Sequence, residues 1–375
     1  MRFIVEEAVT RNILSRDLEV LEPKVVCNLS GPATVEFTLK YLNPTAMEID
    51  WKAYGQIIHV EETFNGVRKI IASAITEPAE LDEATGDLKI KAIGFSGYAK
   101  GIPWLDNWNP VIVDPFEVVE RIWDHIQSYP NGNLDVTVSP TDSGTFLLPG
   151  FGFDGTELVI EFFAYFVRAV DFRDCADEIN KLARDMPFDY LEQSAWNVGR
   201  TQIDKTLALG YPKLGVQRTE LAFRLGENVM SAKPKAEAEI QWVSDVITRG
   251  WFPGRVYSST FTNADPKRFR RVIREEDAKI NSRERAAIWA KRHLTRRQVP
   301  NYWETITIDA HHPSAPMGTW ELGDEIFIQG YMPWIGKVEA WHRIMSYTYD
   351  ANTGQCELTL KHEGAFNYDP LEFES

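Results

Sequence analysis

Apolar and polar residues alternate with a period of two over the first hundred residues, which is the pattern of half-buried β-strands. Turn residues interrupt the alternation at Gly31-Pro32, Asn43-Pro44, Asn65-Gly66 and Thr85-Gly86. Asn65-Gly66 is the strongest hairpin signal, because both residue types tolerate the positive φ that a type I′ turn requires. This spacing is typical of a small barrel or sandwich. Strands are expected at residues 25–29, 33–41, 57–61, 67–75 and 88–92.

The same alternation returns near the end of the chain, where strands are expected at 305–308, 325–329, 339–347 and 356–360. A short pattern also repeats: residues 82–92 and 350–360 each place a Thr-Gly turn before alternating apolar positions. Aligned on that turn, Leu88 falls opposite Cys356, Ile90 opposite Leu358 and Ala92 opposite Leu360. The two hairpins are therefore predicted to share one turn and one buried face. The chain is expected to carry two related small β-barrel modules, which favours symmetric assembly.

Helical periodicity appears between these two β regions. Asp114 is a predicted N-cap, Pro115 suits the first helical position and Glu117 completes a capping box, so a helix is expected from there to Pro130. A second helix is expected over 172–185, ending before Pro187. The strand predicted at 158–167 is almost continuously apolar, which indicates cover on both faces.

The pattern is mixed after residue 200. A strand pair turning at residues 226–228 is expected over 221–229, and the basic segment 264–298 is predicted as two helices or one broken helix. We divide the chain into five parts. An N-terminal β-barrel (1–107) is followed by an α/β insertion (108–200) and by strands that join the second barrel (201–245). A helical basic insertion (246–304) and a C-terminal β-barrel (305–375) complete the chain. The expected fold class is mainly β with α/β insertions: two related small β-barrel modules plus helix-containing middle domains.

Composition is ordinary for a globular protein: the chain has 375 residues, of which 44% are hydrophobic and 25% charged. The N-terminus has neither a signal-peptide pattern nor a long apolar run, so we expect no secretion signal and no membrane-spanning segment. Cys27, Cys175 and Cys356 lie among apolar neighbours, and buried free thiols are the favoured interpretation.

The formal net charge of −15 argues against a protein that coats DNA, since phosphate binding needs a surplus of Lys and Arg. Residues 266–298 are strongly basic, whereas the chain as a whole is acidic. Mixed signs at helical spacing favour a salt-bridged protein contact over a nucleic-acid site. Arg270, Arg271 and Arg274 are the candidate partner-interface residues of this segment.

Candidate chemistry is weak, and we expect neither an enzyme nor a bound cofactor or metal. The sequence holds no Gly-x-Ser-x-Gly, Walker, dinucleotide-binding or His-Glu-x-x-His motif. His311 and His312, with Asp309 nearby, invite a metal site, but neighbouring histidines on a strand point to opposite faces. A hydrolase would use a pair of carboxylates, and the candidates here are Asp185, Asp189 and Glu192. The favoured interpretation is that these three acids are solvated on the surface.

Tryptophan is abundant, with twelve in the chain. Four of them fall in predicted loops and are candidate partner-interface residues: Trp104, Trp108, Trp320 and Trp334. A large amphipathic ring can anchor a protein interface or stack on a sugar. The alternative is that these rings close the barrel ends in the core, and the sequence leaves both open.

Several segments resemble a known family in their order along the chain: Tyr54 to Glu61, Gly94 to Tyr98, Gly101 to Trp104, Val113 to Ser128 and Arg224 to Val229, followed by Gly323 to Gly354. The chain resembles the minor tail proteins of long-tailed phages of actinobacteria, which are similar to the tail-tip or baseplate hub of tailed phages. The resemblance covers most of the chain and rests on order, since no single piece is diagnostic.

The resemblance implies a structural role without an active site. Each subunit of such a hub has two related β-barrels, and three subunits form a homotrimeric ring. The six barrels give the ring pseudo-six-fold symmetry. The ring closes the tail tube and lets DNA pass. The implied partners are the distal tail protein, the tail tube, the tape measure and other tail-tip proteins, with a transient passage of phage DNA. The implied location is the tail tip of the virion, assembled in the host cytoplasm. A tail-associated cell-wall hydrolase and a host-glycan or receptor-binding tail module are the alternatives.

Overall fold

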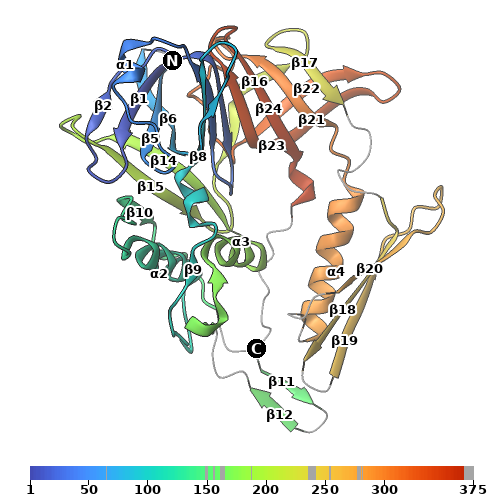
Figure 1. Cartoon of the computed structure of the whole chain (residues 1–375). Helices are drawn as coiled ribbons and strands as arrows, with labels where there is room; N and C mark the ends of the chain where they lie inside the picture. The colour runs from blue at the N-terminus through green and yellow to red at the C-terminus, as the bar shows by residue number, and fades with distance from the viewer. Residues whose placement is uncertain are drawn as a thin grey trace.

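The computed structural model describes residues 1–64, 66–147, 151–154, 157–160, 165–186, 188–234, 242–252, 255–276, 280 and 282–366. Within these residues the architecture is mainly β, most strand pairs are antiparallel, and the helices lie beside the β regions (Figure 1). The expected mainly β fold class, with helices in the middle of the chain, is therefore confirmed.

The first β region comprises β1 (Arg2–Glu7), β2 (Ile13–Ser15), β3 (Leu21–Asn28), β4 (Thr34–Leu39), β5 (Gln56–Phe64), β6 (Val67–Thr76), β7 (Glu80–Leu81) and β8 (Leu88–Gly94), with the short helix α1 (Pro44–Met47). β5 pairs with β1 and β6, and β8 pairs with β4 and β6. Strand β4 shows why the sequence folds this way: Val35, Phe37 and Leu39 are buried while the residues between them are half-buried. The period-two alternation thus identifies the core face. β5 and β6 pair up to Phe64 and Val67, and the predicted turn residue Asn65 lies outside the described residues.

The last β region comprises β16 (Gln217–Arg224), β17 (Val229–Pro234), β21 (Trp303–Asp309), β22 (Glu325–Met332), β23 (Gly336–Asp350) and β24 (Gln355–His362), followed by η3 (Glu363–Ala365). β24 pairs with β21 and β23, and β23 pairs with β22. β16 runs parallel to β22, and β17 runs antiparallel to β21. The strands on either side of residues 225–228 thus pair with the C-terminal strands.

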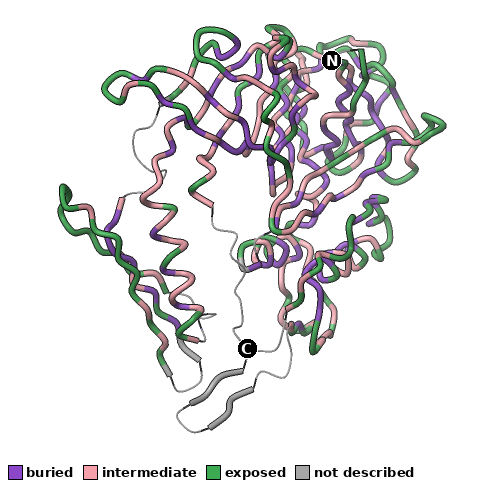
Figure 2. The backbone as a smooth tube through the Cα atoms, turned by 180° about the vertical axis from the view of Figure 1, so that it is seen from behind, coloured by how far each residue is buried: buried purple, intermediate pink, exposed green. Residues whose placement is uncertain are grey.

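A direct strand pair joins the two β regions. β23 pairs with β3, with Ser346 opposite Asn28 and Tyr349 opposite Val25. One cluster of buried apolar side chains extends through both regions and includes Val35 and Ile58 from the first and Ile306 and Leu358 from the last. Figure 2 shows from behind how the buried positions concentrate in these strands. The two β regions therefore share a continuous core.

The repeated Thr-Gly turn takes the same form in both β regions. The Gly86 N–H donates to the Asp82 carbonyl over 2.8 Å, and the Gly354 N–H donates to the Asp350 carbonyl over 2.9 Å. Both glycines have positive φ, +76° and +68°, which glycine adopts without strain. Ile90 and Ala92 are buried on the first hairpin, as are Cys356, Leu358 and Leu360 on the second, while Leu88 is half-buried. The predicted shared turn is confirmed, and the shared buried face holds at the second and third aligned positions.

The middle of the chain comprises η1 (Phe95–Ala99), β9 (Pro103–Trp104), α2 (Pro115–Gln127), β10 (Val136–Ser139), β11 (Phe151–Asp154), β12 (Glu157–Ile160), η2 (Ala169–Asp171), β13 (Arg173–Asp174), α3 (Cys175–Asp185), β14 (Asp189–Trp196) and β15 (Ile203–Gly210). β14 and β15 form a hairpin, and β14 meets the first β region through the single pair Ser194–Ile70. The apolar faces of α2 and α3 and one face of the hairpin enclose a second buried cluster. The helices thus cover the strands that reach the first β region.

Capping chemistry sets where the two helices begin. The Asp114 carboxylate accepts the Phe116 N–H, and Pro115 occupies the first helical turn, as predicted. α3 begins at Cys175, three residues later than expected, because Phe172 is in the left-handed region and Asp174 is the N-cap. Of the strand predicted at 158–167, residues 161–164 lie outside the described residues. β12 ends at Ile160 and pairs with β11 in a two-stranded sheet.

The basic segment belongs to a small α/β unit, which we call the basic module (residues 242–300). Its sheet has β18 (Asp245–Phe252), β19 (Arg255–Thr262) and β20 (Val272–Glu276), and α4 (Arg283–Gln298) lies along it (Figure 1). Its core cluster consists of Val243, Val246, Ala290 and Leu294. The prediction of two helices or one broken helix over 264–298 holds for α4, but it is wrong for 264–271, which form no helix, and for 272–276. The latter stretch is a strand because it pairs in parallel with β18, a long-range contact that its charged sequence does not signal.

Candidate functional site

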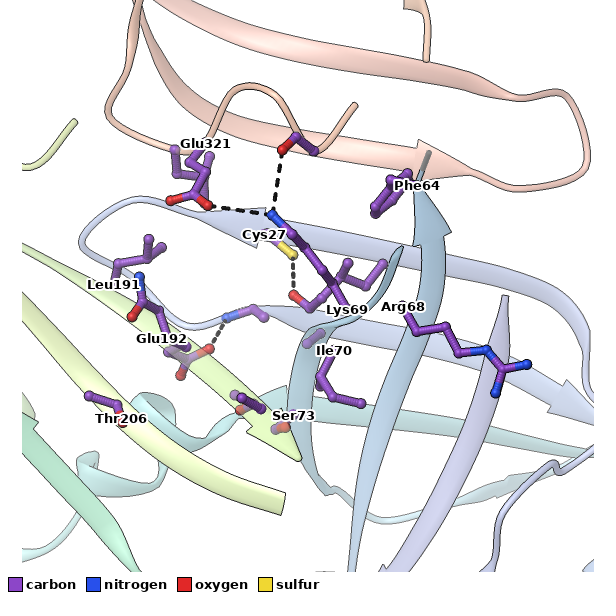
Figure 3. Close-up of a pocket in the computed structure, with 18 of the residues that line it drawn as sticks. Cys27, Phe64, Arg68, Lys69, Ile70, Ser73, Leu191, Glu192, Thr206 and Glu321 are labelled. Carbon is purple, nitrogen blue, oxygen red and sulfur yellow. Dashed lines mark hydrogen bonds and ion pairs between the residues drawn. The ribbon is translucent and has the colours of Figure 1, made fainter. Parts of the chain in front are cut away.

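A cleft lies between β6, β14 and the loop that precedes β22, and its volume is about 740 Å³. These segments come from the first β region, the middle of the chain and the last β region. Lys69 on β6 crosses toward the loop, where its Nζ lies 3.8 Å from Glu321 Oε1 and 3.4 Å from the Gly318 carbonyl oxygen (Figure 3). The cleft is therefore the place where all three parts of the chain meet.

Glu192 lines the cleft, and its carboxylate accepts a backbone hydrogen bond there (Figure 3). The Ala33 N–H donates to Oε2 over 2.9 Å, and the Ser96 N–H donates to Oε1 over 2.5 Å. Burial raises the pKa of Glu192 to about 7, although these hydrogen bonds act in the opposite direction. The fit requires Gly94, since a Cβ there would approach Oε2 to 2.1 Å. The carboxylate thus joins β14 to β4 and to the start of η1.

Asp189 and Glu192, two of the three acids considered for a hydrolase, do not converge on one site. Asp189 forms an ion pair with Arg343 and accepts the Leu214 N–H over 2.8 Å. Glu192 is three positions further along the same strand, so the two side chains leave opposite faces. The side chain of Asp185 lies outside what the structure describes. The described geometry therefore offers no acid–base pair across a substrate-sized gap.

Cys27 also lines the cleft, with its thiol buried. The Sγ lies 3.3 Å from the Ile71 carbonyl oxygen, to which the thiol donates. Burial raises the pKa of Cys27 to about 12, so the thiolate that a nucleophilic cysteine needs is disfavoured. Cys175 and Cys356 are likewise buried free thiols, as the sequence predicts.

A second polar group, missed by the sequence reasoning, lies where β1, β5, β6 and β15 meet. His59 Nδ1 lies 2.7 Å from Ser73 Oγ, and His59 Nε2 lies 3.4 Å from Glu6 Oε2. Arg11 Nε donates to Glu6 Oε1 over 2.5 Å, and Lys205 Nζ lies 3.9 Å from the same oxygen. We call Glu6, Arg11, His59, Ser73 and Lys205 the buried polar cluster.

Burial decides what this cluster can do. Ser73, His59 and Glu6 have the side-chain types of a nucleophilic triad, but their exposed fractions are 2%, 0% and 0%. Burial lowers the pKa of His59 and lowers that of Lys205 to about 8. Burial acts to raise the pKa of Glu6, yet His59 and the neighbouring cations lower it overall. The cluster therefore fixes the first β region against β15; Ser73 also lines the cleft, but His59 and Glu6, the base and acid of such a triad, are fully buried.

The predicted interface tryptophans fall into different environments. Trp104 and Trp320 are buried, with 0% and 3% exposure, so of the two interpretations left open for these rings the one that places them in the core holds. Trp104 packs among the rings of Trp108 and Tyr165, and Trp320 packs on Tyr347, because apolar neighbours from distant strands enclose both. Trp108 is half-buried beneath Arg121, and Trp334 is fully exposed at the β22–β23 turn. Trp334 is thus the one of these four that a partner can reach entirely.

The predicted interface arginines lie on the basic module and are exposed. Arg270 donates to Asp245 through Nε over 3.0 Å and through Nη2 over 3.3 Å. Arg274 Nε lies 3.3 Å from Glu276 Oε1. Their role at an interface remains a prediction.

His311 and His312 take part in local hydrogen bonds of a turn. The His311 N–H donates to Asp309 Oδ1 over 2.9 Å, and His312 Nδ1 accepts the Ser314 N–H over 3.2 Å. Across the described residues, His, Cys, Asp and Glu form no group of three or more that could hold a metal ion. Among the described helices, none is long and apolar enough to cross a membrane.

No family model matches the sequence, and the search of curated proteins found no match either. Solved structures match the fold over nearly the whole chain. The 43 kDa tail protein of prophage MuSo2 from Shewanella oneidensis has a TM-score of 0.60 at 13% identity, with 98% of this chain and 100% of that chain covered. The tail protein from Neisseria meningitidis MC58 has a TM-score of 0.59 at 13% identity, with 99% of each chain covered.

Two further structures extend this range. Prophage tail protein gp18 from Listeria monocytogenes EGD-e has a TM-score of 0.52 at 13% identity and covers 96% of this chain and 94% of its own. The half-lidded Francisella PdpA-VgrG complex includes a chain that matches all of this one over 60% of its own length, with a TM-score of 0.53 at 8% identity. At these identities the likeness concerns the fold. From the first β region to the last, the chain has the fold of solved prophage tail proteins.

Proposed function

We propose that this chain is a structural protein of a bacteriophage tail, and more finely the hub of the tail tip or baseplate. The observation that carries the proposal is the end-to-end match to prophage tail proteins, which includes both β regions and the segments between them. The cleft and the buried polar cluster support a role without catalysis, since the carboxylates and the imidazole named above join parts of the fold.

In this proposal three copies form a ring around the tail axis. The β region 1–107 and the β region built from 201–245 and 305–375 supply two similar units per copy, so that a trimer presents six. The repeated hairpin turns at Gly86 and Gly354 support this internal likeness. A ring of this kind matches a three-fold tip to a six-fold tube.

The ring closes the tail tube at its tip and lets DNA pass during delivery. The negative charge of the chain supports passage, because DNA slides past an acidic or neutral lining without sticking to it. The partners in this role are the tube, the distal tail protein, the tape measure and other tail-tip proteins. The place of action is the virion, after assembly in the host cytoplasm.

The test is the mass of the purified protein by light scattering, followed by negative-stain images of the same fraction. We expect three copies per particle and a ring with six similar lobes around a hole. A compact monomer at all accessible concentrations, also in the presence of the adjoining tail proteins, would contradict the trimeric hub.

A further inference from the structure

The connection between β19 and β20 is an exposed basic segment of the basic module. We call residues 265–271 the Phe269 loop. Phe269 is 98% exposed, and the flanking cations Lys267, Arg270 and Arg271 are exposed as well. Aromatic and arginine side chains are enriched at the centres of protein interfaces, so an exposed ring flanked by cations is a candidate interface anchor.

Hydrogen bonds fix the loop at both ends. Because the loop is already ordered, it loses less conformational entropy when a partner binds. At its start, Asp265 Oδ1 accepts the Lys267 N–H over 2.8 Å, and Arg268 lies above the Trp242 ring at 4.9 Å. At its end, the Arg271 N–H donates to Ser244 Oγ over 2.9 Å, and Arg270 is paired with Asp245. Phe269 is thus displayed from a preformed loop at the end of the three-stranded sheet.

The charge of the basic module has a counterpart on the same chain. Residues 77–87, which comprise β7 and the turn before β8, carry five acids and no Lys or Arg: Glu77, Glu80, Asp82, Glu83 and Asp87. On β8, Lys89 lies opposite Glu80, and Lys91 Nζ lies 3.9 Å from Glu77 Oε2. At its centre Leu81 is 64% exposed, and Glu80, Asp82 and Glu83 around it are exposed too. We call this segment the acidic hairpin.

The acidic hairpin is also preformed. Asp82 Oδ1 accepts the Ala84 N–H over 2.9 Å, and Asp87 Oδ1 accepts the Tyr41 N–H over 2.8 Å. Both segments therefore present one exposed apolar side chain inside a ring of charge, positive on the Phe269 loop and negative on the hairpin. This is complementarity in charge and in apolar centre.

We propose that the Phe269 loop of one copy docks on the acidic hairpin of a second copy. β8 belongs to the first β region, whereas β19 and β20 lie in the separate basic module beside α4 (Figure 1). The contact therefore forms between copies rather than within one. It joins two different surfaces, so it is head-to-tail and repeats around a closed ring. The inference rests on the proposed assembly and names the surfaces that hold it together.

Nucleic acid is the competing occupant of a basic loop with an exposed aromatic ring. A nucleic acid would offer phosphates to the cations and bases to the ring, so these two features do not separate the occupants. The formal net charge of −15 favours the acidic hairpin, because the chain as a whole repels phosphates. Arg270 is also committed to Asp245 within the module. The test is designed to separate these two occupants.

The first test is disulfide trapping between two singly substituted chains, Phe269→Cys and Leu81→Cys, mixed and oxidised with copper phenanthroline. The three native cysteines are buried, which keeps the background low. We expect a cross-linked pair from the mixture and much less from either variant alone. Val198→Cys replaces Leu81→Cys in the control, since Val198 is fully exposed outside the hairpin. Equal cross-linking with Leu81→Cys and with Val198→Cys would overturn the contact.

The second test reverses charge. Lys267→Glu with Arg271→Glu is expected to weaken self-association at least tenfold in sedimentation experiments. Adding Glu80→Lys and Glu83→Lys in the same chain restores it by re-pairing the signs. Lys52→Glu with Lys337→Glu, both exposed elsewhere, makes the same change in net charge and is expected to leave self-association unaltered. A loss that the hairpin substitutions fail to rescue would contradict the pairing.

The third test titrates labelled single-stranded and duplex oligonucleotides against wild type and Phe269→Ala. Tight binding that Phe269→Ala abolishes, with self-association unchanged, would assign the loop to nucleic acid and overturn the inference. Rings in negative stain that the charge reversal leaves intact would also reject this contact while sparing the proposed hub. A trapped Phe269–Leu81 pair in particles without a ring would support the contact and reject the hub.

Discussion

Arg343 is among the largest fully buried side chains, and its guanidinium donates to three acceptors from different parts of the chain. Nε donates to the Gly323 carbonyl over 2.9 Å, and Nη2 donates to the Leu214 carbonyl over 2.7 Å and to Asp189. This one guanidinium joins β23 to β14 and to the loops before β16 and β22. A buried ion pair adds little net stability when intact, but breaking it is costly.

We expect Arg343→Met to lower the free energy of unfolding by about 3–5 kcal/mol, because it removes the shared donor of Asp189 and two buried carbonyls. Urea unfolding followed by tryptophan fluorescence measures this loss. Arg224→Met is the control: its pair with Glu227 is about half exposed on both sides, so about 0.5 kcal/mol or less is expected. Equal losses in the two variants would contradict the role of Arg343.

His342 gives a second prediction at this scale. Burial lowers the pKa of His342 to about 4, and its Nε2 accepts the Trp303 N–H over 3.4 Å. An unfolded histidine titrates near pH 6.5, so below that pH the unfolded chain binds a proton that the folded chain refuses. Stability is therefore complete above about pH 6.5 and falls as the pH decreases toward 4, by about 3 kcal/mol in total.

His342→Gln is expected to remove this part of the pH dependence. The measurement is the difference in unfolding free energy between wild type and variant from pH 7.5 to pH 4, which isolates His342 from the other titrating groups. His311→Gln is the control, because it also removes an imidazole but from an exposed turn. A difference that stays constant across this range would show that His342 titrates alike in both states.

At the scale of elements, the repeated turn depends on two glycines with positive φ. We expect Gly86→Ala and Gly354→Ala each to destabilise by about 1 kcal/mol, because alanine is strained in the left-handed region. A Cβ at these positions would also approach Tyr41 Cγ to 3.1 Å and His311 Cδ2 to 3.2 Å. Chemical denaturation measures both variants. In Gly199→Ala the added Cβ stays at least 3.7 Å from its neighbours and φ is ordinary, so no loss is expected.

Elements whose signals are local could be predicted from the sequence. Asp114 and Pro115 define the start of α2, and alternation defines β4 and the two terminal hairpins. Strand β20 could not be predicted, since its reason is a parallel partner that lies more than twenty residues earlier in the chain. The burial of Trp104 and Trp320 depends in the same way on distant neighbours.

The buried polar cluster had a signal that sequence reasoning overlooked. In β15 the inward positions are Ile203, Lys205, Leu207 and Leu209, so a lysine occupies a place in the apolar alternation. A charged side chain at such a position indicates a buried partner on another strand. The identity of that partner, Glu6, required the tertiary arrangement.

At the scale of the whole molecule, the chain has cores of unequal size. The two β regions share an extensive cluster, whereas the described core of the basic module consists of four side chains. Local opening costs less where fewer apolar contacts are lost. We expect amide hydrogens of β18 and β19 to exchange at least tenfold faster than those of β23 and β24, in hydrogen–deuterium exchange followed by mass spectrometry. Equal protection would show that the module and the β regions open as one unit.

The pairing of β3 with β23 has a consequence during synthesis. Val25 and Tyr349 are partners more than three hundred positions apart. While the ribosome is still making the middle of the chain, β3 lacks this neighbour, and half of the shared core has not yet been translated. A chain that stops early therefore keeps an open strand edge, which directs it toward aggregation and degradation rather than toward its mature partners. Only a chain that has been translated to β23 can therefore complete the shared core and go on to assemble.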